Sequence, residues 1–228
     1  MQRVLKIGHR GAAGHAPENS LGAIQTGIAL GVDFVEIDVR RTADGVLVIL
    51  HDETVNRTTN GKGQIDRVSL QEAKQLNAGN GETIPTLEEA ISVLAGRAGL
   101  LLELKVNGVA QQAVETVRRA GLTAPVIYAS FLHEELTQVH IFDPNAPLML
   151  LFGRLPRNPV AWTLTHGASH IGLRHDRARR SLVEASHRAD LLVCVYTVDN
   201  PRDIQHVLSL GVDGVISNYP DRIRSACR

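Results

Sequence analysis

The segment FVEIDVR (residues 34–40) and its return VLVILHD (residues 46–52) decide the fold and the candidate site. The first segment has the alternation of a β-strand, which sends successive side chains to opposite faces. Glu36 and Asp38 therefore share one face, and the apolar residues around them share the other. Two carboxylates on one face of a mostly buried strand repel each other, and burial raises the free-energy cost. A bound cation is the simplest way to relieve that repulsion.

The turn TADG at residues 42–45 joins the two segments, and its glycine supplies a positive-φ position. Pairing the segments as an antiparallel hairpin places Arg40 opposite about Leu47 and Glu36 opposite about His51. The hairpin then returns an imidazole to the carboxylates. A slip of one residue in this register turns His51 away from Glu36.

Short apolar runs alternate with amphipathic helical segments along almost the whole chain. With the hairpin's return set aside, we expect eight strands, each followed by a helix: residues 4–7, 34–40, 100–105, 126–130, 148–152, 169–173, 191–198 and 214–217. Eight βα units in 228 residues predict a TIM (β/α)8 barrel, an α/β fold, as a single domain over residues 1–228. Residues 53–85 are polar and rich in Gly and Asn, and we expect them to form a small insertion after the hairpin.

A doubly wound open sheet is the competing fold. It usually carries a glycine-rich, phosphate-binding turn after its first strand. In this chain the first strand ends in GHRG at residues 8–11, which does not match a dinucleotide-binding sequence. The barrel is therefore the preferred prediction.

Two helix starts carry capping residues. Asn19 or Ser20 is expected to cap the first helix, and Thr86 with Glu89 matches a capping box. Glu18 has two equal interpretations, because it either orients Arg10 or supports the cap at Asn19.

Composition narrows the classes of partner. The 24 Lys and Arg residues balance the 24 Asp and Glu residues, which argues against nucleic acid as a partner. The longest apolar runs are about five residues, far short of the roughly 20 that span a bilayer, so no stable membrane insertion is expected. Cys194 and Cys227 form no disulfide framework, and a reducing compartment is the default. We expect a cytoplasmic protein, a monomer or a homodimer.

Ionisable residues concentrate at the ends of the first three expected strands. In a TIM barrel the active site lies at the C-terminal ends of the strands. The residues placed there are His9, Arg10, Glu36, Asp38, His51, Glu103 and Lys105. Packing alone does not explain such a concentration.

Glu36, Asp38 and Glu103 are hard oxygen donors, which suit Mg²⁺, Ca²⁺ or Mn²⁺ better than zinc. The competing interpretation is that each carboxylate pairs with a cationic side chain, namely Arg10, Arg40 or Lys105.

The two histidines and two of the cations suit phosphate chemistry. His9 and His51, if they flank one point, can act as general base and general acid near neutral pH. Arg10 and Lys105 can hold phosphate oxygens. Lys105 can also balance the charge of Glu103, and the two roles are compatible.

Ordered short motifs give a more specific indication. They are His9-Arg10-Gly11, Pro17-Glu18-Asn19-Ser20, Glu36-Ile37-Asp38-Val39, His51-Asp52, Arg57-Thr58-Thr59-Asn60-Gly61, Ile84-Pro85-Thr86-Leu87-Glu88-Glu89, Glu103-Leu104-Lys105, Ser130-Phe131, Tyr196-Thr197-Val198 and residues 213–221. Each is weak alone, but the ordered set covers almost the whole chain and resembles the glycerophosphodiester phosphodiesterase family.

That resemblance implies a TIM barrel with residues 53–85 as a family-type insertion. It implies one divalent cation on Glu36, Asp38 and Glu103, with Mg²⁺ or Ca²⁺ as the first choices and Mn²⁺ as a third. It also implies that His9 and His51 form the acid–base pair and that Arg10 and Lys105 bind the phosphodiester. The implied substrate is a small glycerophosphodiester, which would be hydrolysed to glycerol 3-phosphate and an alcohol.

The chain departs from the family pattern on its late strands. Tyr196 stands where Trp is frequent, and Asn218 where Asp is common. These differences affect the fit of the substrate more than the chemistry, and we place Tyr196 and Phe131 in the substrate pocket.

The mechanism follows from charge. A phosphodiester is an anion, so its oxygens must be neutralised before a nucleophile can approach. We take His9 as the base that activates the nucleophile and His51 as the acid that protonates the leaving alkoxide. The nucleophile is either water or the substrate's own glycerol hydroxyl.

Two other functions compete with this one. A related barrel phosphodiesterase would act on lysophospholipid or sphingolipid head groups, and the polar insertion counts against it. A barrel that only binds ligands should have lost at least one of the two histidines or three carboxylates, and all five are present.

Overall fold

Eight parallel strands form a closed barrel in the computed structural model, which describes residues 3–223. The strands are β1 (Leu5–Gly8), β2 (Phe34–Arg41), β4 (Gly99–Leu104), β5 (Val126–Ser130), β6 (Leu148–Phe152), β7 (His170–Arg174), β8 (Leu192–Tyr196) and β9 (Gly214–Ser217). β1 pairs with both β2 and β9, which closes the ring. The predicted TIM barrel is confirmed.

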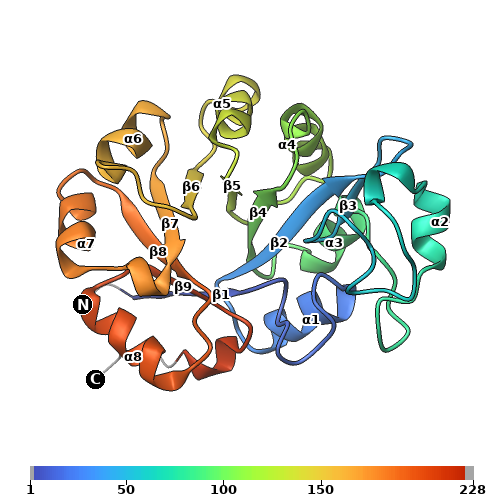
Figure 1. Ribbon diagram of the computed structural model, residues 1–228, viewed down its shortest axis with the longest axis horizontal. Coiled ribbons are helices and arrows are strands. Elements are labelled where there is room, and N and C mark those ends of the chain that lie inside the picture. The colour runs from blue at the N-terminus through green and yellow to red at the C-terminus, as the bar shows by residue number, and fades with distance from the viewer. Residues whose placement is uncertain (1–2, 224–228) are drawn as a thin grey trace.

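Helices surround the strands, as Figure 1 shows. They are α1 (Leu21–Ala29), α2 (Leu70–Gln75), α3 (Leu87–Leu94), α4 (Ala110–Arg119), α5 (His133–Phe142), α6 (Pro159–Thr165), α7 (Arg180–His187) and α8 (Pro201–Leu210). After β9 the described residues contain a 3-10 turn, Pro220–Arg222, in place of the expected helix. Cys227 lies outside the described residues. No helix among residues 3–223 combines the length and apolar content that a bilayer crossing requires.

The alternation of side chains along the strands produces two apolar layers. One layer fills the barrel interior and includes Ile7, Phe34, Leu101, Met149, Cys194 and Ile216. The other lies between the barrel and its helices and includes Val35, Ile37, Val39, Leu100, Leu102 and Leu104. Each fully buried aliphatic side chain contributes about 1.5–3 kcal/mol of transfer free energy. Packing therefore fixes the orientation of each strand, and with it the polar face of β2.

The hairpin after β2 has a register that differs by one residue from the expected one. β3 (Leu47–Ile49) runs antiparallel to β2, and Arg40 pairs with Val48 rather than with Leu47. The backbone N–H of Thr42 donates to the Val46 carbonyl (2.9 Å), and the Val46 N–H donates to Thr42 Oγ1 (3.0 Å). These bonds centre the turn between residues 42 and 46, which sets the observed register.

The shift does not remove His51 from the site. The β2–β3 ladder ends at Ile49, and Leu50 N–H makes one further bond, to the Asp38 carbonyl (2.9 Å). His51 lies beyond these bonds, so the following turn sets its orientation instead of the pleat. The expected pairing of Glu36 with His51 is wrong, although both side chains line the same pocket.

Residues 53–85 leave the barrel after β3 and build a small core of their own. Figure 1 shows α2 at the outer edge of the molecule, beyond β3. A 3-10 turn at Ile65–Arg67 precedes α2. The buried apolar residues of this cluster are Val48, Leu50, Val55, Ile65, Ala73 and Ile84. The segment is therefore tied to the hairpin that carries His51.

Candidate active site

His9 and Arg10 follow β1 in a tight turn that depends on two glycines. A Cβ on Gly8 would lie 2.0 Å from the Gly11 carbonyl oxygen, and a Cβ on Gly11 would lie 2.4 Å from the Ala23 carbonyl carbon. Arg10 itself has a φ of 50°, in the left-handed region that residues with side chains rarely adopt. Such strain persists where the surrounding structure requires it, often at functional sites.

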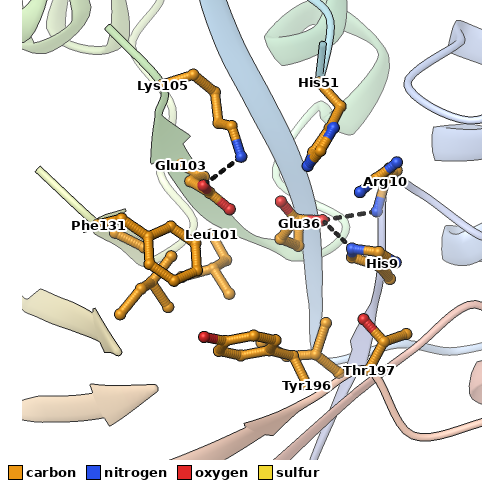
Figure 2. A pocket seen from close by; sticks show the side chains of 13 residues that line it. His9, Arg10, Glu36, His51, Leu101, Glu103, Lys105, Phe131, Tyr196 and Thr197 are labelled. Carbon is orange, nitrogen blue, oxygen red and sulfur yellow. Dashed lines mark hydrogen bonds and ion pairs between the residues drawn. The ribbon is translucent and has the colours of Figure 1, made fainter. Parts of the chain in front are cut away.

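The C-terminal ends of the barrel strands enclose a pocket of about 120 Å³. It is lined by His9, Arg10, Glu36, His51, Leu101, Glu103, Lys105, Ala129, Phe131, Leu151, Tyr196, Thr197 and Ile216. Figure 2 shows Glu36 between Glu103 with Lys105 on one side and the two histidines with Arg10 on the other. Of the predicted site residues, only Asp38 does not line the pocket, and it lies buried against Arg10 and Lys105.

Three carboxylates converge at one point. Glu36, Asp38 and Glu103 each offer an oxygen atom, and these atoms all lie within 4.8 Å of one another. Burial, followed by repulsion from Asp38, raises the pKa of Glu36 well above its usual value and that of Glu103 to about 7. Burial alone would also raise the pKa of Asp38, but Lys105 and Arg10 hold it below its ordinary value.

Ion pairs account for only part of this carboxylate group. Glu103 lies 2.6 Å from Lys105 Nζ, and Asp38 lies 3.5 Å from Lys105 Nζ and 3.4 Å from Arg10 Nε. Glu36 Oε2 accepts the backbone N–H of Arg10 (2.7 Å), but Glu36 Oε1 is buried without a hydrogen-bond partner. Buried polar atoms are normally satisfied, and an orphaned oxygen beside two more hard donors fits a divalent cation.

His9 is held in one tautomer by a chain of hydrogen bonds. Asn218 donates its Nδ2 to Asp199 Oδ2 (2.7 Å), and its Oδ1 lies 2.7 Å from His9 Nδ1. Because a carboxylate only accepts, Asp199 turns the amide oxygen toward His9, and Nδ1 must carry the proton. Nε2 is left as an acceptor, 4.0 Å from Glu36 Oε2. Burial, with Arg10 nearby, lowers the pKa of His9 to about 4.

His51 has a charged partner where His9 has a neutral one. Its Nδ1 lies 2.7 Å from Asp52 Oδ1. Burial lowers the pKa of His51, and the carboxylates of Asp38 and Asp52 oppose that shift. Arg40 donates its Nε to the His51 carbonyl (2.9 Å) and so supports the backbone of this turn instead of pairing with the three carboxylates.

The opposite wall of the pocket is aromatic and apolar. The rings of Phe131 and Tyr196 meet edge to face, with centroids 5.9 Å apart. The Tyr196 hydroxyl donates to the Phe152 carbonyl (3.0 Å), so Tyr196 presents its ring to the pocket and not its hydroxyl. Lys105 Nζ lies 5.8 Å from the Phe131 ring centroid, at the border between the two walls.

Several supporting residues are absent from the predicted site. Asn19 donates its Nδ2 to Asp38 Oδ2 (2.8 Å), whereas Ser20 is the residue that caps α1. Glu18 accepts from Arg10 Nη1 (2.6 Å), which decides between its two interpretations. Asp199 orients Asn218 from a separate loop. The sequence places Glu18 and Asn19 within a short motif and Asp199 next to one. It does not show which residues they bind, because the partners lie elsewhere in the chain.

Comparison with known proteins identifies the family and supports the barrel fold. The model of the glycerophosphoryl diester phosphodiesterase family matches residues 9–222. A glycerophosphodiester phosphodiesterase of Caldanaerobacter subterraneus is 31% identical over 239 residues, covering 99% of this chain and 98% of that protein. A phosphodiesterase of Oleispira antarctica, solved in complex with the product sn-glycerol-3-phosphate, superposes with a TM-score of 0.91 at 31% identity, covering 95% of this chain and 94% of its own. A glycerophosphodiester phosphodiesterase of Agrobacterium tumefaciens gives a TM-score of 0.86 at 31% identity, over 98% and 99% of the two chains. The chain belongs to the glycerophosphoryl diester phosphodiesterase family of enzymes.

Proposed function

We propose that the protein hydrolyses glycerophosphodiesters to glycerol 3-phosphate and an alcohol, with one divalent cation held by Glu36, Asp38 and Glu103. The observation that carries the metal requirement is the buried, unpartnered Oε1 of Glu36 in a pocket with two histidines. Mg²⁺ and Ca²⁺ suit this all-oxygen donor set, and Mn²⁺ accepts the same donors. When bound, such an ion polarises the phosphoryl oxygens and lowers the barrier to attack by a nucleophile.

The balance of charge supports the substrate class. Cation ligation requires the three carboxylates to be ionised, and in that state they and the cations Arg10 and Lys105 leave a net charge of −1 at the centre of the site. A divalent cation makes that charge +1, which one phosphodiester anion neutralises. Arg10 and Lys105 lie on opposite sides of Glu36 (Figure 2), and this arrangement supports their proposed role in holding the phosphate oxygens.

The partners of the two histidines support distinct roles. Asn218 is a neutral acceptor and stabilises a protonated His9 less than a carboxylate would, so the ring rests neutral with a free Nε2 that can accept a proton as the general base. Asp52 is a carboxylate and stabilises a protonated His51, which suits the general acid. His9 then takes the proton of the nucleophile, and His51 delivers a proton to the leaving alkoxide.

The lipid-acting alternative has less support. The large exposed apolar side chains among the described residues are Phe131, Ile141, Trp162 and Leu164, none of them in residues 53–85. An enzyme that works at a lipid surface needs an apolar contact area around its entrance.

A coupled assay for glycerol 3-phosphate tests the proposed function. Glycerophosphocholine, glycerophosphoethanolamine and glycerophosphoglycerol are offered with Mg²⁺, Ca²⁺, Mn²⁺ or EDTA, beside a lysophospholipid and sphingomyelin. We expect glycerol 3-phosphate from the water-soluble diesters, lost in EDTA and restored by a divalent ion. Turnover of only the lipids, or of no diester with any metal, would contradict the proposal.

A further inference from the structure

One arginine of the insertion joins two of the site residues. Arg57 makes two bonds to Asp52, from Nε to Oδ2 (2.7 Å) and from Nη2 to Oδ1 (3.0 Å). It also makes two bonds to Glu18, from Nη1 to Oε2 and from Nη2 to Oε1, both 2.7 Å. A single planar guanidinium thus holds two carboxylates, each in a bidentate pair.

Each of these carboxylates reaches the pocket through one further bond. Asp52 Oδ1 lies 2.7 Å from Nδ1 of His51, and Glu18 Oε1 accepts from Nη1 of Arg10 at 2.6 Å. Arg57 is therefore the centre of a continuous chain that ends at His51 on one side and at Arg10 on the other. Both end residues line the pocket, whereas Arg57 does not.

We propose that Arg57 is a positioning residue that fixes His51 and Arg10 together and so makes turnover depend on the folded insertion. The inference rests on the proposed function for the roles of His51 and Arg10. Without Arg57, Asp52 and Glu18 lose the cation that aligns them and are left as two neighbouring like charges. Each can then rotate, and the groups they orient lose their fixed geometry.

Hydrogen bonds hold the backbone of the loop that carries Arg57. The buried Val55 donates its N–H to the Gly63 carbonyl (3.0 Å). Its carbonyl accepts from the N–H (3.1 Å) and the hydroxyl (2.7 Å) of Thr59. A side chain on a loop fixed by such bonds loses little conformational entropy when it orients its partners, which suits a positioning role.

The exposure of the Arg57 side chain distinguishes a positioning role in catalysis from a role in folding stability. The Arg57 side chain is 48% exposed, so solvent screens its ion pairs in part and limits their contribution to folding stability. Loss of Arg57 should therefore impair turnover far more than it lowers the melting temperature. A small misplacement of reacting groups is enough for a large change in rate.

The kinetic test uses Arg57→Ala, Arg57→Lys and the control Arg67→Ala, an exposed arginine in the same insertion. We expect Arg57→Ala to lower kcat by roughly 10- to 100-fold through His51 and to raise KM several-fold through Arg10. Arg57→Lys should recover part of the loss, since one ammonium keeps the charge but not both bidentate pairs. Arg67→Ala should match the wild type.

Comparing a triple variant with a double variant tests whether Arg57 acts through its two partners. Adding Arg57→Ala to Asp52→Asn with Glu18→Gln should cost less than about three-fold more, because coupled residues are not additive. Full additivity, or wild-type kinetics in Arg57→Ala, would overturn the proposal.

A readout without substrate separates this proposal from the proposed function. Long-range ¹H–¹⁵N spectra of the histidine rings, with His51→Asn to assign the signal, should show His51 protonated at Nδ1 in the wild type and mixed tautomers in Arg57→Ala. Unchanged ring signals would overturn the positioning role. If the wild type hydrolyses no diester, the proposed function fails, and the ring spectra alone decide the role of Arg57.

Discussion

Apolar packing does not explain why Glu36 is buried where it is. It is 4% exposed, lies beside two other carboxylates, and has one oxygen without a partner. Buried charge of this kind destabilises a fold unless something binds it. Residues kept at a cost to stability are typical of functional sites.

Glu36→Gln should therefore stabilise the metal-free protein. The amide replaces a carboxyl group whose ionisation burial and the neighbouring carboxylates oppose, and it supplies a donor to those carboxylates, so we expect a gain of about 1 kcal/mol in the free energy of unfolding. Urea unfolding in EDTA measures it. A loss of stability of similar size would show that Glu36 is held by contacts other than those described.

The rates of the His9 and His51 variants should depend differently on the leaving group of the substrate. His9→Asn and His51→Asn should each slow the hydrolysis of an alkyl diester by about 100-fold or more. A p-nitrophenyl diester needs little protonation of its leaving group, so it should restore much of the rate of His51→Asn but not of His9→Asn. Rescue of His9→Asn instead would reverse the two assignments.

At the residue scale, the sequence predicts the charged side chains that approach the pocket but not those that hold them. Strand alternation and the barrel rule are enough to bring Glu36, Asp38 and Glu103 together. The bond between Asn19 and Asp38 joins a loop to a strand, and no local pattern distinguishes it from a helix cap. The left-handed backbone of Arg10 likewise has no signal, because arginine has no preference for it.

At the element scale, α4 depends on a carboxylate from the next helix. Val109 precedes α4 without a side-chain cap. Glu135 of α5 instead accepts the N–H groups of Gly108 (2.9 Å), Val109 (2.7 Å) and Ala110 (2.6 Å). This buried carboxylate satisfies donors that the start of α4 leaves open.

Glu135→Ala should destabilise the protein by about 2–3 kcal/mol, because three N–H groups lose a charged acceptor. The exposed neighbour Glu134 is the matched control, and Glu134→Ala should change stability by less than about 0.5 kcal/mol. Denaturant midpoints measure both. Equal midpoints for the two variants would exclude the capping role of Glu135.

The sequence predicts the two strands of the hairpin after β2 but not their register. Composition identifies both strands and the turn, but the register depends on how Thr42 bonds to Val46 across the loop. Alternation alone cannot choose between registers one residue apart when the returning strand is apolar at every position from 46 to 50. His51 reaches the pocket through the turn that follows β3, which the pattern of the strand does not describe.

At the scale of the whole molecule, the pocket has a charged side and an aromatic, apolar side. The strands β1, β2 and β4 carry the charged groups, and later strands supply Phe131, Tyr196 and an apolar wall (Figure 2). The regular βα alternation is enough to predict the closed barrel, because eight equal units have few other ways to bury every strand. The insertion's own core and its link to the site through Arg57 arise from contacts distant in sequence, which composition cannot reveal.

Under the proposed function, hydrolysis of the diester requires a cation at Glu36, Asp38 and Glu103. The most direct measurement is the release of glycerol 3-phosphate by metal-stripped protein as Mg²⁺ or Ca²⁺ is added, with Glu36→Gln in parallel. We predict that the stripped wild type is inactive and recovers with single-site saturation, whereas Glu36→Gln stays at least about 100-fold slower at every ion concentration. Full turnover by the stripped wild type, or full recovery of Glu36→Gln, would exclude this cation requirement.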